Sequence, residues 1–239
     1  MKVDILAFGA HPDDVELGCG GSICKAISQG LKVGIVDLTN GELGTRGSPE
    51  IRKKESNKAS EILGVSFRKN LGFKDGFFIN DMKHQLKVVE VLREHKPLIV
   101  FCNAVKDRHI DHPKGSRLIV DSCFLSGLLK IKTNYKNSKD QFPWTPKQIY
   151  HYIQWYDVEP DILIDISNFQ KKKMKAIMAY NSQFYNPESN EPNTPISSKN
   201  FIDSIMYRDQ NFGRISGVVA AEGFTVERPP LIKDFKGIL

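Results

Sequence analysis

Two short clusters of histidines and carboxylates hold the side chains that are best suited to chemistry in this chain. Ala10-His11-Pro12-Asp13-Asp14 follows the apolar run 3–10, and His109-Ile110-Asp111-His112 follows the apolar run 98–101. Either cluster alone would be a weak signal, because His-Pro-Asp commonly forms a turn in which the aspartate bonds its own backbone. Both clusters, however, follow predicted buried strands, and parallel strands of an open α/β sheet end at the same edge. We therefore expect the two clusters to meet in one crevice.

The donor types in these clusters fit a catalytic metal site. His11, Asp14 and His112 form a set of two imidazoles and one carboxylate, and three protein ligands leave a position open for water. A metal in such a site lowers the pKa of its bound water to about 7 and polarises a carbonyl oxygen. Neighbouring side chains point in different directions, so Asp13 can act as general base while Asp14 faces the metal. Asp111 is a candidate carboxylate partner of an imidazole. The donor set suits Zn²⁺, with Fe²⁺ as an alternative.

The remaining sequence predicts the elements that must position these residues. The first two-thirds of the chain alternates strand and helix signals, with expected strands at 3–10, 32–39, from about 65, and 98–103, and expected helices at 18–29, 49–63 and 81–97. This alternation predicts a Rossmann-like, mostly parallel sheet with helices on both faces. The less regular part that follows is expected to hold a loop or lid at 130–146, strands at 148–155 and 161–167, and helices at 170–181 and 201–214. We expect a single domain, 1–239, with this part as a C-terminal elaboration.

Composition limits the classes of function. The chain has 239 residues, a formal net charge of +6 and 40% hydrophobic residues, without an apolar run long enough for a membrane span. Its start lacks the features of a signal peptide, which favours a cytoplasmic location. No basic helix with interleaved aromatics points to nucleic acid, and the run 171–173 is interpreted as a solvated helix face. The positive charge favours a small acidic substrate, and the four cysteines are expected to be core thiols.

Other candidate motifs carry less weight. Gly18-Cys19-Gly20-Gly21 lacks the spacing of a dinucleotide-binding loop, and the carboxylates before it would repel a pyrophosphate. These glycines are expected to allow close helix packing instead. His84 and His95 are interpreted as structural, whereas the sequence assigns no role to His151 or Gln154.

The motifs together resemble the LmbE/PIG-L family of zinc-dependent N-deacetylases. The resemblance rests on the two clusters with Arg108, and on the loop Gly41-Glu42 with Gly44-Thr45-Arg46-Gly47. Ser182-Gln183-Phe184-Tyr185-Asn186-Pro187 and Ala221-Glu222-Gly223-Phe224 are similar to the bacillithiol-biosynthesis branch, the N-acetylglucosaminyl-malate deacetylases. Two departures are visible: Ala220 stands where relatives have tyrosine, and Ile110 where they have proline.

The resemblance implies a role for each of nine residues. Zinc would be held by His11, Asp14 and His112. Asp13 would be the general base, and His109, neutral or as an imidazolium, would stabilise the tetrahedral intermediate while Asp111 orients it. The substrate's malate carboxylates would contact Arg52 and Arg108, and Tyr185 would donate a hydrogen bond to the oxyanion. Hexamers are common in this branch, so a homo-oligomer is expected.

The sequence therefore predicts a metal-dependent hydrolase that removes acetate from an N-acetylglucosamine conjugate, with malate as the expected aglycone. One alternative is the same reaction on another acetylated sugar, such as a chitobiose-like sugar, a mycothiol-type precursor or an antibiotic intermediate. The other is a non-catalytic sugar- or nucleotide-binding module. The adjacent carboxylates Asp13 and Asp14 argue against a pure binder, which needs no base beside a metal ligand.

Overall fold

The computed structural model describes residues 1–135, 139–232 and 234 of the chain. Its elements in chain order are β1 (Ile5–Gly9), α1 (Asp14–Ser28), β2 (Val33–Thr39), α2 (Pro49–Leu63), β3 (Phe67–Phe73), α3 (Met82–His95), β4 (Ile99–Cys102), α4 (Asp111–Ser126), β5 (Asn134–Tyr135), β6 (Lys139–Asp140), β7 (Gln148–Tyr152), β8 (Ile162–Asp165), α5 (Gln170–Ile177), α6 (Lys199–Ser216) and β9 (Ala221–Val226).

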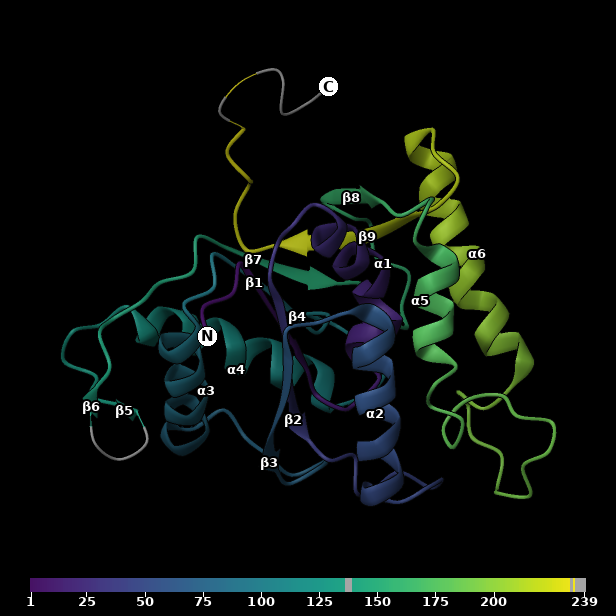
Figure 1. Ribbon diagram of the computed structural model, residues 1–239, viewed down its shortest axis with the longest axis horizontal. Coiled ribbons are helices and arrows are strands. Elements are labelled where there is room, and N and C mark those ends of the chain that lie inside the picture. The colour runs from purple at the N-terminus through teal and green to yellow at the C-terminus, as the bar shows by residue number, and fades with distance from the viewer. Residues whose placement is uncertain (136–138, 233, 235–239) are drawn as a thin grey trace.

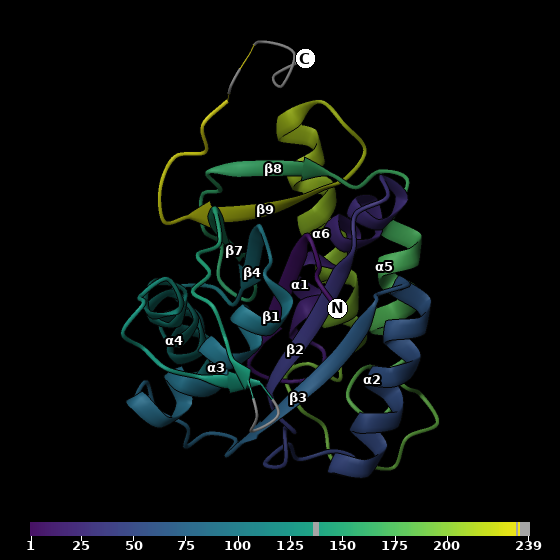
Figure 2. The same cartoon turned by 60° about the vertical axis from the view of Figure 1, so that its left-hand side comes forward.

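Seven strands form one twisted sheet in the order β3-β2-β1-β4-β7-β9-β8 (Figures 1 and 2). The five strands from β3 to β7 are parallel, whereas β9 runs antiparallel to both β7 and β8. The chain leaves β1 toward β2 and β3 and then returns to place β4 on the other side of β1. Ligand crevices in open α/β sheets lie outside the carboxyl ends of the strands at such a reversal. The predicted Rossmann-like fold is confirmed.

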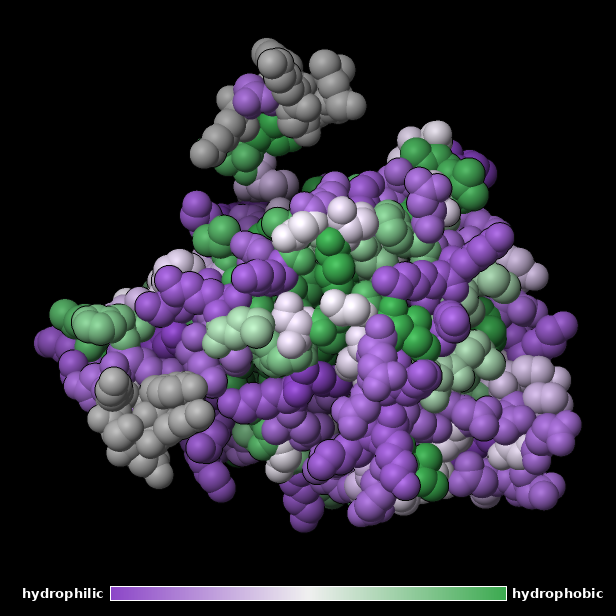
Figure 3. Space-filling model, viewed as in Figure 1, coloured by the Kyte–Doolittle hydropathy of each residue, from purple (hydrophilic) through white to green (hydrophobic). Residues whose placement is uncertain are grey.

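Helices cover both faces of the sheet, as Figure 2 shows. Side chains alternate along β1: Ile5 and Ala7 join a core with α1, α2 and α5, whereas Leu6 and Phe8 join a core with α3 and α4. Because successive residues of a strand face opposite sides of the sheet, β1 must be apolar at nearly every position. Figure 3 shows that hydrophilic residues cover most of one face of the molecule, with apolar residues between them near its middle. Within the described part of the chain, every helix is too short or too polar to span a bilayer.

The helix α1 begins earlier than predicted. It starts at Asp14 instead of residue 18, and it is kinked at Cys19, where the backbone leaves helical geometry (φ −146°, ψ 21°). The glycines around the kink allow close packing, as expected: a Cβ on Gly18 would lie 2.1 Å from the Tyr152 ring, and one on Gly21 would lie 2.7 Å from Ile166. The early start places Asp14 in the first turn of a helix.

Two elements, α4 and β9, were not predicted from the sequence at all. The segment 130–146 contains the short antiparallel pair β5–β6, and part of the predicted loop, 136–138, lies outside the described residues. All four cysteines are buried free thiols, as expected.

The lysine run 171–173 is only partly the solvated face that its charge predicted: Lys171 and Lys172 are exposed, whereas Lys173 is not. Lys173 is fully buried, and its ammonium lies 2.9 Å from the carboxylates of both Asp209 on α6 and Glu222 on β9. Glu222 also accepts hydrogen bonds from the backbone N–H groups of Gly21 and Ser22, just beyond the kink in α1. This buried ion cluster joins α1, α5, α6 and β9 beneath the sheet.

Candidate active site

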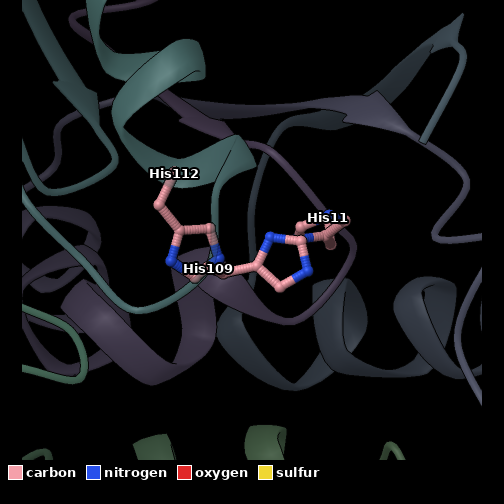
Figure 4. Close-up of side chains that lie close together, drawn as sticks. All are labelled: His11, His109 and His112. Carbon is pink, nitrogen blue, oxygen red and sulfur yellow. The ribbon is translucent and has the colours of Figure 1, made fainter. Parts of the chain in front are cut away.

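Three histidines converge at the carboxyl ends of β1 and β4, where the sheet order reverses. His11 follows β1, His109 lies in the loop after β4, and His112 is in the first turn of α4; Figure 4 shows their rings close together. The centroid of the His11 ring lies 4.5 Å from that of the His109 ring and 5.6 Å from that of the His112 ring. The two sequence clusters therefore meet in one crevice, as the strand-end argument predicted.

The predicted ligands surround the carboxylate of Asp14. Its Oδ1 lies 3.0 Å from Nε2 of His112, and its Oδ2 lies 3.5 Å from Nδ1 of His11. All three side chains are buried or nearly so, and the Asp14 carboxylate lies between the two imidazoles, with one oxygen toward each. Two nitrogens and a carboxylate oxygen in this arrangement fit a divalent cation such as Zn²⁺.

The second nitrogen of each predicted histidine ligand is held by a carboxylate. Nε2 of His11 lies 3.0 Å from Asp75 Oδ1, and Nδ1 of His112 lies 3.0 Å from Asp107 Oδ1. Carboxylates in this position orient a metal-binding imidazole and raise its basicity, which supports a metal site here. Sequence analysis missed both residues. Asp107 could have been found from its spacing of five residues before His112, whereas Asp75 has no local motif.

The carboxylates around the two histidines raise the pKa values of both imidazoles. Burial acts to lower the pKa of His112, but Asp14 and Asp107 outweigh it and raise that pKa to about 9. Burial is likewise outweighed at His11, where hydrogen bonds to Asp111, Asp14 and Asp75 raise the pKa well above its usual value. A metal must displace these protons, because only neutral imidazole binds it.

Two other groups of ligand atoms lie within 4.8 Å of one another among the described residues. One consists of His11, His109 and His112, and the other of His11, Asp75 and Asp111. Both share His11 with the predicted set but lack Asp14, whose carboxylate lies 3.0 Å from His112.

The carboxylate of Asp111 contacts His11, whereas the resemblance implied that it orients His109. Its Oδ2 lies 3.6 Å from Nε2 of His11 and accepts a 2.7 Å hydrogen bond from the backbone of Gly76, while Lys114 holds its Oδ1. Only the backbone N–H of Asp111 reaches His109, at Nδ1. The reason is geometric: Asp111 opens α4, and its side chain turns back toward the end of β1.

That backbone contact fixes the tautomer of His109. Since Nδ1 accepts a hydrogen bond at 3.3 Å, the proton of a neutral ring must be on Nε2. Burial, together with the neighbouring His11 and His112, lowers the pKa of His109 to about 4. His109 is therefore a neutral hydrogen-bond donor at pH 7, which disfavours the imidazolium option.

The predicted base, Asp13, has an unusual backbone and a buried carboxylate. Its φ of 119° lies in the left-handed region, which is strained for a non-glycine residue. Burial raises the pKa of Asp13 to about 7, although the nearby guanidinium of Arg52 acts in the opposite direction. A carboxylate with a pKa near the working pH is suited to accept and return a proton.

Arg52 is bound to the predicted base. Its Nη2 lies 2.7 Å from Asp13 Oδ2 and 3.0 Å from the Pro12 carbonyl, and its Nη1 donates to the Gly41 carbonyl. A Cβ at position 41 would lie 1.8 Å from Nη1, so this close approach requires the glycine, which also has a φ of +64°. Arg52 thus holds Asp13, and because it also lines the pocket its predicted contact with malate stays a prediction.

A pocket of about 580 Å³ opens over the predicted ligands His11, Asp14 and His112 and over Asp13. One wall is apolar and includes Leu17, Trp155 and Phe201. Arg108 also lines the pocket, with its guanidinium 4.4 Å from the centre of the Trp155 ring. Among the described arginines of this pocket, it is the one whose guanidinium forms no hydrogen bond or ion pair with the protein.

Tyr185 is 37% exposed and is not part of the lining, so the structure does not bring it to the pocket.

Known proteins that are similar to this chain share the region that contains these residues. The PIG-L family profile, described as GlcNAc-PI de-N-acetylase, matches residues 6–123, which include both clusters. The chain is 28% identical over 190 residues to diacetylchitobiose deacetylase of Thermococcus kodakarensis, covering 75% of this chain and 70% of that protein. It is 25% identical over 207 residues to the probable N-acetyl-alpha-D-glucosaminyl L-malate deacetylase 2 of Bacillus cereus, covering 77% and 84%. The crystal structure of the conserved protein TT1542 from Thermus thermophilus superimposes with a TM-score of 0.85 at 36% identity, covering 96% and 97%.

Proposed function

This chain belongs to the PIG-L family of de-N-acetylases, and on that premise we propose that it hydrolyses the N-acetyl group of N-acetylglucosaminyl-malate with a bound metal. One observation carries the proposal: His11, Asp14 and His112 direct ligand atoms at one another beside the buried base Asp13, at the floor of an open pocket. We assign Zn²⁺ to these ligands, with Fe²⁺ as the alternative that the same donors serve. When bound, such an ion polarises the amide carbonyl and makes water more acidic.

The chain's own residues supply the proton transfers. Asp13, oriented by Arg52, accepts a proton from the attacking water as the water oxygen bonds to the amide carbon. His109 stabilises the negative charge that develops on the carbonyl oxygen by donating a hydrogen bond from its Nε2–H, and it keeps its proton. The carbon–nitrogen bond then breaks, and Asp13 returns its proton to the leaving amine. The products are acetate and a free amino sugar.

The substrate assignment rests on Arg108. The guanidinium of Arg108 is available at the pocket wall, and a planar guanidinium binds carboxylate through two parallel hydrogen bonds. A malate carboxylate fits this position. The similarity to the Bacillus cereus protein supports the same substrate.

A substrate panel tests the proposal. Zinc-loaded protein is mixed in turn with N-acetylglucosaminyl-malate, diacetylchitobiose and N-acetylglucosamine, and released acetate is measured, with the Asp13→Asn variant as control. We expect the highest kcat/KM on the malate conjugate and negligible release by the variant. Turnover of another sugar in preference to the malate conjugate would contradict the substrate, and no turnover of any sugar would contradict the hydrolase.

The second candidate is the same reaction on a chito-oligosaccharide. The relative from Thermococcus kodakarensis favours it, because that protein is a diacetylchitobiose deacetylase at slightly higher identity. Preferred release of acetate from diacetylchitobiose in the panel would select this candidate.

A further inference from the structure

Two side-chain amides hold the carboxylate of Asp14, and neither belongs to a motif found in the sequence. Asn103 follows β4, and Gln154 follows β7; both are buried. Nδ2 of Asn103 donates to Asp14 Oδ2 at 3.0 Å, and Nε2 of Gln154 donates to Asp14 Oδ1 at 3.1 Å. The ends of three parallel strands thus meet on one carboxylate.

The orientation of both amides is fixed by their other contacts. Oε1 of Gln154 accepts hydrogen bonds from Asn103 Nδ2 and from the backbone N–H of Ala104, so its NH₂ group must face Asp14. Oδ1 of Asn103 accepts the backbone N–H of Ala10 at 2.8 Å, so its NH₂ group must face Asp14 and Gln154. Reversing either amide would place oxygen against oxygen.

The donors are distributed unequally over the two oxygens of Asp14. Oδ2 accepts two N–H groups, from Asn103 and from the backbone of His11 at 2.9 Å, and also lies 3.5 Å from the His11 ring, so its lone pairs are engaged within the protein. Oδ1 accepts one amide N–H, from Gln154, and its remaining lone pair faces His112 Nε2. Oδ1 is therefore the oxygen that remains available to a cation.

Neutral donors suit this task better than charged ones. A lysine or arginine in the place of Gln154 would also hold the carboxylate, but its positive charge would oppose a cation bound a few ångströms away. An amide restricts the carboxylate without that repulsion. The backbone of Gln154 is separately anchored, because Arg208 on α6 donates to its carbonyl oxygen.

We propose that Asn103 and Gln154 are positioning residues that restrict Asp14 to binding the metal through Oδ1 alone, and that they thereby set the metal affinity of the site. This inference rests on the proposed function, since it assumes that Asp14 is a metal ligand. Partners of this kind typically change metal affinity by about 10–100-fold when they are removed.

The test compares Gln154→Leu with Gln183→Leu. Gln183 is also a buried glutamine of the pocket, but its amide donates to the Arg46 carbonyl and to Ser182 instead of to Asp14. Dissociation constants for Zn²⁺ are measured by competition with a chelator. We expect a rise of about 10–100-fold for Gln154→Leu, following the effect of second-sphere partners, and a wild-type value for Gln183→Leu.

The visible spectrum of the Co²⁺-loaded protein provides a second readout. Loss of the Gln154 hydrogen bond removes the donor that holds Asp14 Oδ1, so the carboxylate can turn about its Cβ–Cγ bond, and the changed ligand geometry shifts the d–d bands. Equal affinities and spectra for the wild type and Gln154→Leu would overturn the inference. If Gln154→Leu does not fold, Gln154→Asn replaces it, because its shorter side chain cannot reach Asp14 and predicts the same loss. Wild-type protein that binds no Zn²⁺ would overturn the proposed function, and this inference with it.

Discussion

Two buried clusters of carboxylates in this molecule differ in the source of their positive charge. Beneath the sheet, Lys173 supplies a permanent ammonium to Asp209 and Glu222. At the strand ends, Asp14 faces histidines that are neutral or charged depending on pH and on what is bound. The first cluster is complete as folded, whereas the second can exchange its protons for a cation.

The difference separates a structural cluster from a functional one. The ion cluster of Lys173 is closed off from solvent and joins elements distant in the chain. The cluster at the strand ends opens onto a pocket and includes a residue, Asp13, with strained backbone. Titratable groups with displaced pKa values inside a pocket are typical of catalytic sites.

The largest expected effect is on catalysis at the open cluster. Asp13→Asn removes the base but can still accept the hydrogen bond of Arg52, so folding and metal content should be unchanged. General acid–base catalysis typically contributes about 10²–10⁴-fold, and kcat should fall by that amount. Acetate release and metal content per protein are measured together. A variant that retains wild-type kcat would show that Asp13 is not the base.

The closed cluster should affect stability instead. Lys173→Met leaves Asp209 and Glu222 buried without their cation, and breaking a buried ion pair in this way costs about 3–5 kcal/mol of unfolding free energy. The matched control is Lys171→Met, because Lys171 is exposed on the same helix. Urea unfolding of the three proteins checks the prediction. Equal stability of Lys173→Met and Lys171→Met would show that the buried ion cluster does not stabilise the fold.

Metal affinity should depend on pH at the open cluster. The His112 imidazolium, with its pKa of about 9, must lose its proton before a metal binds. Below that pH, each displaced proton weakens binding by about tenfold per pH unit, so affinity rises from pH 6 toward pH 9. Chelator competition across this range measures the slope. Affinity that is independent of pH would mean that the ion does not displace His112's proton.

The smallest expected effect is a change in the KM for the substrate when Arg108 is replaced. Arg52 is neutralised by Asp13, whereas Arg108 stacks on Trp155. Hydrogen bonds to charged groups contribute about 1.5–3 kcal/mol, so Arg108→Gln should raise KM for N-acetylglucosaminyl-malate by about tenfold or more. Its kcat, and its KM for uncharged diacetylchitobiose, should change little. An equal change of KM for both substrates would show that Arg108 does not recognise the carboxylate.

The sequence predicted that His11, Asp14 and His112 lie together, because both clusters follow predicted parallel strands of one sheet. Parallel strands end at a shared edge, and the structure places the three side chains side by side there. The apolar run that forms β1 was therefore as important for predicting the site as the His-Pro-Asp-Asp motif itself.

What the sequence did not predict depends on contacts between distant residues. Lys173 is buried because Asp209 and Glu222 come to it from other elements, and a run of three lysines contains no sign of that. The start of α4 lacks a capping side chain, since its N-cap residue is Ile110, so no local signal marked the helix. The role of Arg52 was likewise set by the fold, which places Asp13 within its reach.

The central claim is that His11, Asp14 and His112 share one divalent cation. Diffraction data from Zn²⁺-soaked crystals, collected at the zinc absorption edge, test it directly. The account predicts one anomalous peak about 2.0–2.2 Å from His11 Nδ1, Asp14 Oδ1 and His112 Nε2. A peak between His11 Nε2, Asp75 and Asp111, or no peak at the strand ends, would contradict it.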